Sequence, residues 1–174
     1  MGPWVYCRHM ASPDAVIRRA VASDLAALGR FGAALMRQHH TYDPQRFMAP
    51  GDRPEDGYAW FLGTQLEHED VAIFVAEQDG AVIGYVYAGL EPQSWKELRD
   101  ACGYVHDIVV ETGGRRHGAG TALMQAALAW LRQRKAPRVV LWTSPHNENA
   151  QRLFDHLGFR RTMIEMTREL EDGQ

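Results

Sequence analysis

The sequence predicts a single mixed α/β domain in which helices flank a sheet. Three stretches support this prediction. Residues 105–134 pass from an apolar run through a glycine-bearing turn to apolar positions at helical spacing. Residues 71–88 form two β-rich runs around Asp79-Gly80, and residues 138–157 repeat the order strand, turn, helix. The 174 residues are enough for one domain with a proper core.

The composition narrows the class of protein. With 45% hydrophobic and 24% charged residues, the chain resembles an ordinary globular protein. A formal charge of −3 argues against general binding of nucleic acid. Cys7 and Cys102 have neither metal-site nor disulfide-framework spacing, so we expect reduced thiols, no metal and a cytoplasmic location. No signal peptide and no run of about 18 apolar residues is evident, so we expect no membrane partner.

The first elements precede the hairpin. We expect residues 1–14 to be a loose extension, with Met10 as an alternative start, and residues 15–171 to form the domain. Residues 15–20 predict a short strand, after which Ser23 is expected to cap a helix.

A loop and a second helix follow. Residues 39–54 contain three prolines and predict an irregular stretch, and residues 55–67 predict a helix. Aromatic residues here are typical of a core, but Tyr42 and Trp60 are also candidate substrate contacts, because long loops often carry specificity.

A hairpin and a surface excursion come next. Residues 71–77 and 81–88 predict paired strands, with Asp-Gly as the turn. The polar residues 91–102 predict a short helix, placed to cover one mouth of a site.

The stretch of residues 105–134 has the features of an anion site. Its strand runs over residues 105–110, and its helix starts near Gly118 and Gly120. Free N–H groups and the dipole at a helix start favour phosphate, and Arg115 and Arg116 add positive charge. The alternative is that the glycines serve packing alone. Neither a dinucleotide fingerprint nor a Walker loop is present.

The last predicted elements are a strand, a helix and a strand. Residues 138–143 predict a strand, and residues 147–157 a helix that Gly158 closes. The alternation in residues 160–170 predicts a final strand.

Two motifs resemble the GNAT acyl-CoA N-acyltransferases. Residues 115–120 match motif A, Arg/Gln-x-x-Gly-x-Gly/Ala after an apolar strand. Residues 147–159 match motif B, Asn-x-x-Ala-x-x-Leu-Tyr-x-x-x-Gly-Phe, except that Phe154 replaces the tyrosine. With the hairpin, the resemblance covers about residues 16–170. It implies a GNAT fold, in which a mostly antiparallel central sheet is splayed at the cofactor strand and flanked by helices, and it implies acetyl transfer from acetyl-CoA to an amine.

The resemblance also implies where coenzyme A binds. Main-chain N–H groups of the turn would hold the pyrophosphate, the key strand would pair with the pantetheine arm, and motif B would contact the arm near the thioester. The residues implied are Ile108, Val109, Val110, Arg115, Arg116, His117, Gly118, Ala119, Gly120, Thr121, Asn147 and Phe154.

His106 and Asp107 are the catalytic candidates. His106 occupies a position where several members carry a general base, and an imidazole with a pKa near 6.5 accepts a proton at pH 7. The alternative is a core histidine. Asp107 would attract a cationic amine or orient the imidazole, while Glu111 is a weaker candidate base. Simple alternation puts Tyr104, His106, Ile108 and Val110 on one face of the strand and Val105, Asp107 and Val109 on the other.

The departure at Phe154 leaves two functions open. The motif B tyrosine usually donates a proton to the leaving thiolate, which a phenyl ring cannot do. Either the thiolate leaves unassisted or another group donates, and a domain that binds acyl-CoA as a sensor without turnover is the alternative. The acceptor is also open: small amines, amino acids, peptide N-termini and protein lysines all fit. The sequence is also compatible with a homodimer.

Overall fold

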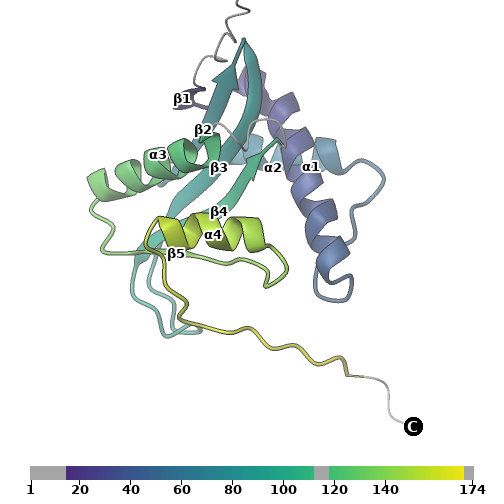
Figure 1. Cartoon of the computed structure of the whole chain (residues 1–174), viewed down its shortest axis with the longest axis vertical. Coiled ribbons are helices and arrows are strands. Elements are labelled where there is room, and N and C mark those ends of the chain that lie inside the picture. The colour runs from purple at the N-terminus through teal and green to yellow at the C-terminus, as the bar shows by residue number, and fades with distance from the viewer. Residues whose placement is uncertain (1–14, 112–117, 171–174) are drawn as a thin grey trace, which may run out of the picture.

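A five-stranded mixed sheet forms the centre of the protein (Figure 1). The structure is a computed structural model that describes residues 15–111 and 118–170. The strands lie in chain order, the first four antiparallel to their neighbours and the last parallel to β4. They are β1 Val16–Arg19, β2 Val71–Gln78, β3 Ala81–Glu91, β4 Cys102–Val110 and β5 Val139–Leu141. The predicted α/β class and mostly antiparallel sheet are confirmed.

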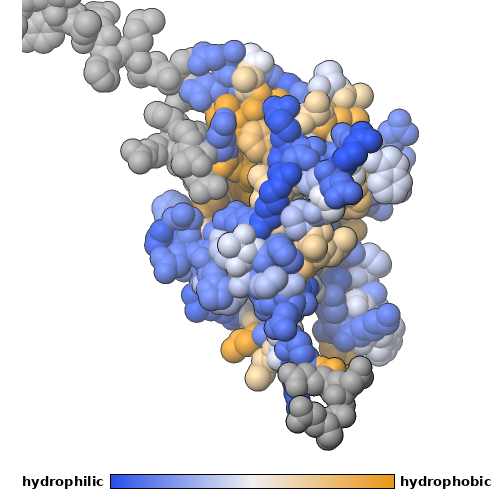
Figure 2. All heavy atoms as spheres, turned by 90° about the vertical axis from the view of Figure 1, so that its right-hand side faces the viewer, coloured by the Kyte–Doolittle hydropathy of each residue, from blue (hydrophilic) through white to orange (hydrophobic). Residues whose placement is uncertain are grey.

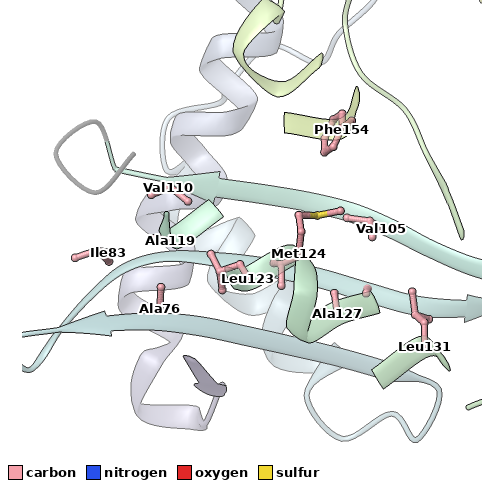
Figure 3. Close-up of a cluster of buried hydrophobic side chains, with 12 residues drawn as sticks. Ala76, Ile83, Val105, Val110, Ala119, Leu123, Met124, Ala127, Leu131 and Phe154 are labelled. Atoms are coloured by element: carbon pink, nitrogen blue, oxygen red, sulfur yellow. The ribbon is translucent and has the colours of Figure 1, made fainter. Parts of the chain in front are cut away.

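Helices cover both faces of the sheet. Helices α1 (Leu25–Tyr42) and α2 (Pro54–Gln65) pack on one face, where Leu28 and Leu62 meet Ile73 and Tyr85. Helices α3 (Ala119–Gln133) and α4 (Glu148–His156) pack on the other face (Figure 1). Figure 3 shows this second cluster, in which α3 side chains and Phe154 lie over the sheet. Burial of these apolar side chains is the main driving force for the layered fold.

The predicted turn and cap are confirmed in their geometry. Asp79 and Gly80 have φ values of 52° and 77°, as a two-residue hairpin turn requires. Gly158 has a φ of 83° after α4, and the Phe159 N–H donates to the Phe154 carbonyl at 3.0 Å.

The entry into α1 differs from the prediction that Ser23 caps a helix. A short 3₁₀ turn, η1 (Ala22–Asp24), comes first, and Asp24 is the N-cap residue of α1. The Asp24 carboxylate accepts from the Val21 N–H at 2.9 Å and from Arg18 at 2.7 and 3.0 Å. Asp24, not Ser23, therefore stands at the start of α1, because its carboxylate accepts from Arg18 of β1 and from the Val21 backbone at the same time.

The excursion before β4 is not a helix, contrary to the prediction. Ser94 and Arg99 pair across a turn through two backbone hydrogen bonds of 2.8 and 3.0 Å. Leu98 has a φ of 50°, which is incompatible with a right-handed helix.

The predicted final strand is also wrong. Residues 160–170 form no helix or strand and extend away from the domain (Figure 1). Met163, Ile164, Met166 and Leu170 are exposed. Arg46 of the loop after α1 donates to Glu165 at 3.0 Å. The segment has the alternation of a strand, but no strand in residues 15–111 and 118–170 pairs with it, and without a partner its backbone remains irregular.

The surface on the α1 side is largely hydrophilic, with smaller apolar patches between polar side chains (Figure 2). None of the helices in the described ranges is long and apolar enough to cross a membrane.

Candidate active site

Strands β4 and β5 pair over a short distance and then separate. Their parallel register joins Gly103 to Val139, Tyr104 to Val140 and Val105 to Leu141. Strand β5 ends there, while β4 continues to Val110. The separation agrees with the splayed sheet that the GNAT resemblance implies beside the cofactor strand.

A narrow cavity of about 50 Å³ lies at this separation. Both catalytic candidates, His106 and Asp107, line it. So do three of the residues predicted to contact the cofactor, Ile108, Asn147 and Phe154. The wall is completed by residues of α1, β4 and α4 and by the end of β5 with the two residues after it, namely Leu35, His39, Val105, Ala150, Leu141, Trp142 and Thr143.

A β-bulge at His106 changes the predicted facing of β4. Tyr87 is paired with Asp107 and the next residue, Ala88, with Val105, so His106 is the extra residue. Val105, Ile108 and Val110 therefore contact the α3 cluster, and Val109 the α1–α2 cluster. His106 stacks on Tyr87 of that second cluster, and Tyr104 stacks on His106. The expectation of simple alternation through residues 104–110 is wrong, because one inserted residue shifts the period.

Two tyrosines hold the His106 imidazole. Its ring stacks between Tyr87 and Tyr104, with centroids 4.6 and 4.7 Å away and interplanar angles of 28° and 23°. Glu91 places a carboxylate oxygen 3.3 Å from Nε2. Burial lowers the pKa of His106 below its ordinary value of about 6.5, although the charges of Glu91 and Asp107 oppose this shift. The imidazole is therefore mainly neutral at pH 7 and able to accept a proton.

Asp107 is fixed by hydrogen bonds from two tyrosines of the α1–α2 cluster, the cluster to which Tyr87 also belongs. The Tyr58 and Tyr85 hydroxyls donate to one carboxylate oxygen, Oδ2, at 2.8 and 2.9 Å. Burial raises the pKa of Asp107, while these two donors and the nearby His106 and His39 oppose the rise. Because the carboxylate has two tyrosine partners, it is better suited to positioning β4 beside His106 than to taking a proton itself.

A wider cavity of about 340 Å³ also borders His106. Its walls come from the end of β3, the turn before β4, β4 itself and the residue after β5. The residues are Glu91, Glu97, Arg99, Tyr104, His106 and Trp142. Since His106 and Trp142 line both cavities, the imidazole lies between two spaces that two reactants could occupy. The excursion of residues 91–102 lines a mouth of the site, although without its predicted helix.

The start of α3 contains part of the predicted phosphate site. Gly118 is the N-cap with a φ of 76°, a left-handed conformation that favours glycine. Ala119, Gly120 and Thr121 form the first turn, whose N–H groups lack intrahelical acceptors. A Cβ on Gly120 would point inward, 3.5 Å from the Leu153 side chain and 3.7 Å from that of Val110. Gly120 therefore leaves space against α4 and β4 rather than in front of the helix.

The other residues predicted to bind the cofactor lie in the segment before α3 and on β4. Arg115, Arg116 and His117 lie outside the described residues, as do residues 1–14 and Cys7. Val109 and Val110 lie on β4 beyond the stretch that pairs with β5.

The two predicted residues of α4 also have structural roles. The Asn147 side-chain oxygen accepts from the Ala150 N–H at 3.2 Å and caps the helix. Phe154 is buried in the α3 cluster (Figure 3), and its ring centroid lies 5.8 Å from that of Phe159. The two residues support the fold of α4 and line the narrow cavity at the same time.

Sequence reasoning missed four residues that contact the catalytic candidates: Tyr87 and Glu91 at His106, and Tyr58 and Tyr85 at Asp107. The period of two along β3 could have placed Tyr85 and Tyr87 on one face. Glu91 ends the same strand. Tyr58 is one of the aromatic residues of the second predicted helix, a group that is typical of a core. By contrast Trp60, a candidate substrate contact, is 73% exposed and lines neither cavity, and Tyr42 packs against His39 and His146.

Comparisons with known proteins identify the family. The profile described as the Acetyltransferase (GNAT) family matches residues 34–159. A mycothiol acetyltransferase of Thermomonospora curvata is 32% identical over 121 residues, which cover 66% of this chain and 38% of that protein. The chain thus spans well under half of that relative. An uncharacterized N-acetyltransferase of Bacillus subtilis, YhfO, is 30% identical over 145 residues, which cover 82% of this chain and 88% of that protein.

A solved structure gives the same result for the fold. The aminoglycoside N-acetyltransferase AAC(6')-Iy, crystallised in complex with CoA, has a TM-score of 0.71 at 20% sequence identity, covering 93% of this chain and 97% of the other. The profile match extends from α1 to the end of α4 and includes β4, the start of α3 and both cavities. The chain belongs to the GNAT acetyltransferase family.

Proposed function

We propose that this domain transfers an acetyl group from acetyl-CoA to a primary amine of a small molecule or peptide, by direct attack in a ternary complex. The observation that carries the proposal is the position of His106 between two cavities, one at the β4–β5 separation and one beside Glu91. A donor in the first and an acceptor in the second would meet at a neutral imidazole. The CoA bound in AAC(6')-Iy supports the same choice of donor.

Donor binding would use the separated strands and the start of α3. The pantetheine arm would lie along Ile108 to Val110 as an added strand beside β4. The pyrophosphate would meet the N–H groups of residues 118–121, with Arg115, Arg116 and His117 in the preceding turn. Asn147 and Phe154 would contact the arm near its sulfur. No metal is needed in this scheme.

In the reaction, the amine nitrogen attacks the thioester carbonyl and forms the new C–N bond. His106 accepts the proton that the nitrogen loses, directly or through a water molecule. The tetrahedral intermediate then collapses, the C–S bond breaks, and the bonding electrons leave with sulfur. Asp107, held by Tyr58 and Tyr85, acts as a positioning residue for β4 next to His106 and adds negative charge that favours a cationic acceptor.

The motif B position cannot protonate the departing thiolate, because Phe154 stands there in place of a tyrosine. A thiol pKa near 8.5 makes the thiolate an acceptable leaving group at pH 7, and water can supply its proton afterwards. The proposal therefore assigns Phe154 only to packing beside the sulfur.

A screen of amines with acetyl-CoA tests the proposal. Free CoA thiol would be measured with a colorimetric reagent, and the acetylated amine would be identified by mass spectrometry. Thiol release that requires both an amine and an intact His106 is the expected result. Phe154 favours a second candidate, binding of acyl-CoA without turnover. Tight acetyl-CoA binding by calorimetry, with no amine acetylated across the screen, would establish that alternative.

A further inference from the structure

The wide cavity beside His106 carries information about the acceptor. It has about 340 Å³, which lies within the range of small-molecule sites. Three of its residues are aromatic or imidazole rings, and three are charged. Different contacts hold the charged side chains and the rings in place.

Arg99 does not offer its charge to a ligand. Its side chain is only 14% exposed, and its Nε donates to Glu97 at 2.8 Å. One terminal nitrogen lies within hydrogen-bonding distance of the Asp100 carbonyl at 3.1 Å and of the Cys102 sulfur at 3.0 Å. The guanidinium therefore braces the turn of residues 94–102 and neutralises Glu97.

Glu91 is the second carboxylate of this cavity, and unlike Glu97 it is not paired with Arg99. Among the ion pairs of residues 15–111 and 118–170, Glu91 pairs with His106 alone. His106 is mainly neutral at pH 7, because burial opposes its protonation. With Glu97 balanced by Arg99, the cavity keeps a net negative charge next to the imidazole.

The aromatic wall adds a second attraction for a positive group. Trp142 follows the end of β5 and is 66% exposed. Its indole meets the Tyr104 ring at an angle of 75° with centroids 6.3 Å apart, so the two rings stand edge to face. The electron-rich face of an exposed indole attracts ammonium and guanidinium groups. An exposed tryptophan at the mouth of an acidic cavity is well suited to such a group.

We infer that this cavity is an acceptor subsite for a compound with two positive groups, such as a linear diamine or polyamine, which it selects over amines that carry a carboxylate. One amine would react beside His106, while Glu91 and the Trp142 indole attract the charges of the compound. A carboxylate in the same place would be repelled by Glu91. The inference rests on the proposed function, because it assumes that the acceptor binds on this side of His106.

Three compounds of similar length isolate the charge of the distal group. They are 1,5-diaminopentane, pentylamine and 6-aminohexanoate, whose distal groups are positive, neutral and negative. Binding of each would be measured by calorimetry to the protein saturated with CoA, so that no reaction is required. We expect the diamine to bind at least tenfold more tightly than pentylamine, and 6-aminohexanoate to bind most weakly.

Two variants and one control connect the preference to these residues. Glu91→Gln and Trp142→Leu should each reduce the diamine preference severalfold, and both change groups that are at least partly exposed. Asp79→Asn removes one carboxylate in the same way at the hairpin turn, the other end of an 11-residue strand and about 30 Å away. This control should keep the full preference.

Equal affinity for the three compounds, or no binding of the diamine, would overturn the subsite. A preference that survives in both Glu91→Gln and Trp142→Leu would overturn the assignment to this cavity. A parallel assay with acetyl-CoA separates the two ideas. Diamine binding without acetylation would contradict the proposed function and leave the subsite intact, whereas acetylation at equal rates for all three compounds would contradict the subsite alone.

Discussion

Replacement of His106 by alanine should remove the group that takes the acceptor's proton. The ring is held between Tyr87 and Tyr104 and lines both cavities, so its loss changes the place where the two reactants would meet. General base catalysis by a positioned side chain contributes about 10²- to 10⁴-fold. The expected fall in kcat is of that size, or about 3–5 kcal/mol in the activation free energy. Affinity for acetyl-CoA should change little.

The pH dependence of kcat gives a sharper readout than its size. At an ordinary pKa of about 6.5, about three quarters of imidazoles are neutral at pH 7. Burial lowers the pKa of His106, so a still larger fraction is neutral, and activity should fall only when the pH drops below 6.5. Glu91→Gln removes a charge that favours the imidazolium, so its acidic limb should move to still lower pH.

The assay is kcat measured by thiol release at saturating acetyl-CoA and amine between pH 5 and 8. The control is His156→Ala, which removes an exposed histidine at the end of α4. The acidic limb should disappear in His106→Ala and persist in His156→Ala. An unchanged limb in His106→Ala would refute the assignment and move the proton to Asp107, Glu111 or water.

Three further perturbations test the cofactor site, the fold and the leaving group. Gly118→Ala forces a residue with a Cβ into a φ of 76°, which costs about 1–2 kcal/mol, so acetyl-CoA affinity measured by calorimetry should fall roughly tenfold. In the control Gly120→Ala, the new Cβ makes ordinary contacts, and acetyl-CoA should bind normally. Arg18→Met should lower the free energy of unfolding by about 2 kcal/mol at pH 7. Because Arg18 lowers the pKa of buried Asp24, this deficit should vanish in urea melts as the pH falls through that lowered pKa. Phe154→Tyr should leave kcat at pH above 8 unchanged; a severalfold rise would mean that protonation of the thiolate limits the rate.

The regular elements around the site could be predicted because each carries its own local signal. Strand β4 is a short apolar run, helices α3 and α4 repeat apolar residues at helical spacing, and Asp79-Gly80 and Gly158 mark the turn and the cap. These signals depend on residues a few positions apart, so the sequence alone contains them. The family profile then supports the arrangement of the same elements.

The wrong predictions concern features that depend on distant partners. Residues 160–170 alternate as a strand should, but alternation supplies no neighbouring strand, and Met163 and Ile164 remain exposed. Ser23 is a suitable cap by its chemistry, but Asp24 takes that place because Arg18 lies within reach of its carboxylate. In both cases the outcome depends on what is nearby in space.

The bulge at His106 also depends on a distant partner, because it is defined by how β4 pairs with β3, and it lies at the centre of the site. An unbulged β4 would place His106 and Asp107 on opposite faces. The extra residue instead lets His106 stack on Tyr87 while Asp107 accepts from Tyr58 and Tyr85. The regular pairs on either side keep the rest of β4 in the core. The irregular point of the strand is thus the place where an imidazole can stand between two cavities, so deleting the bulge should disrupt the site more than it disrupts the sheet.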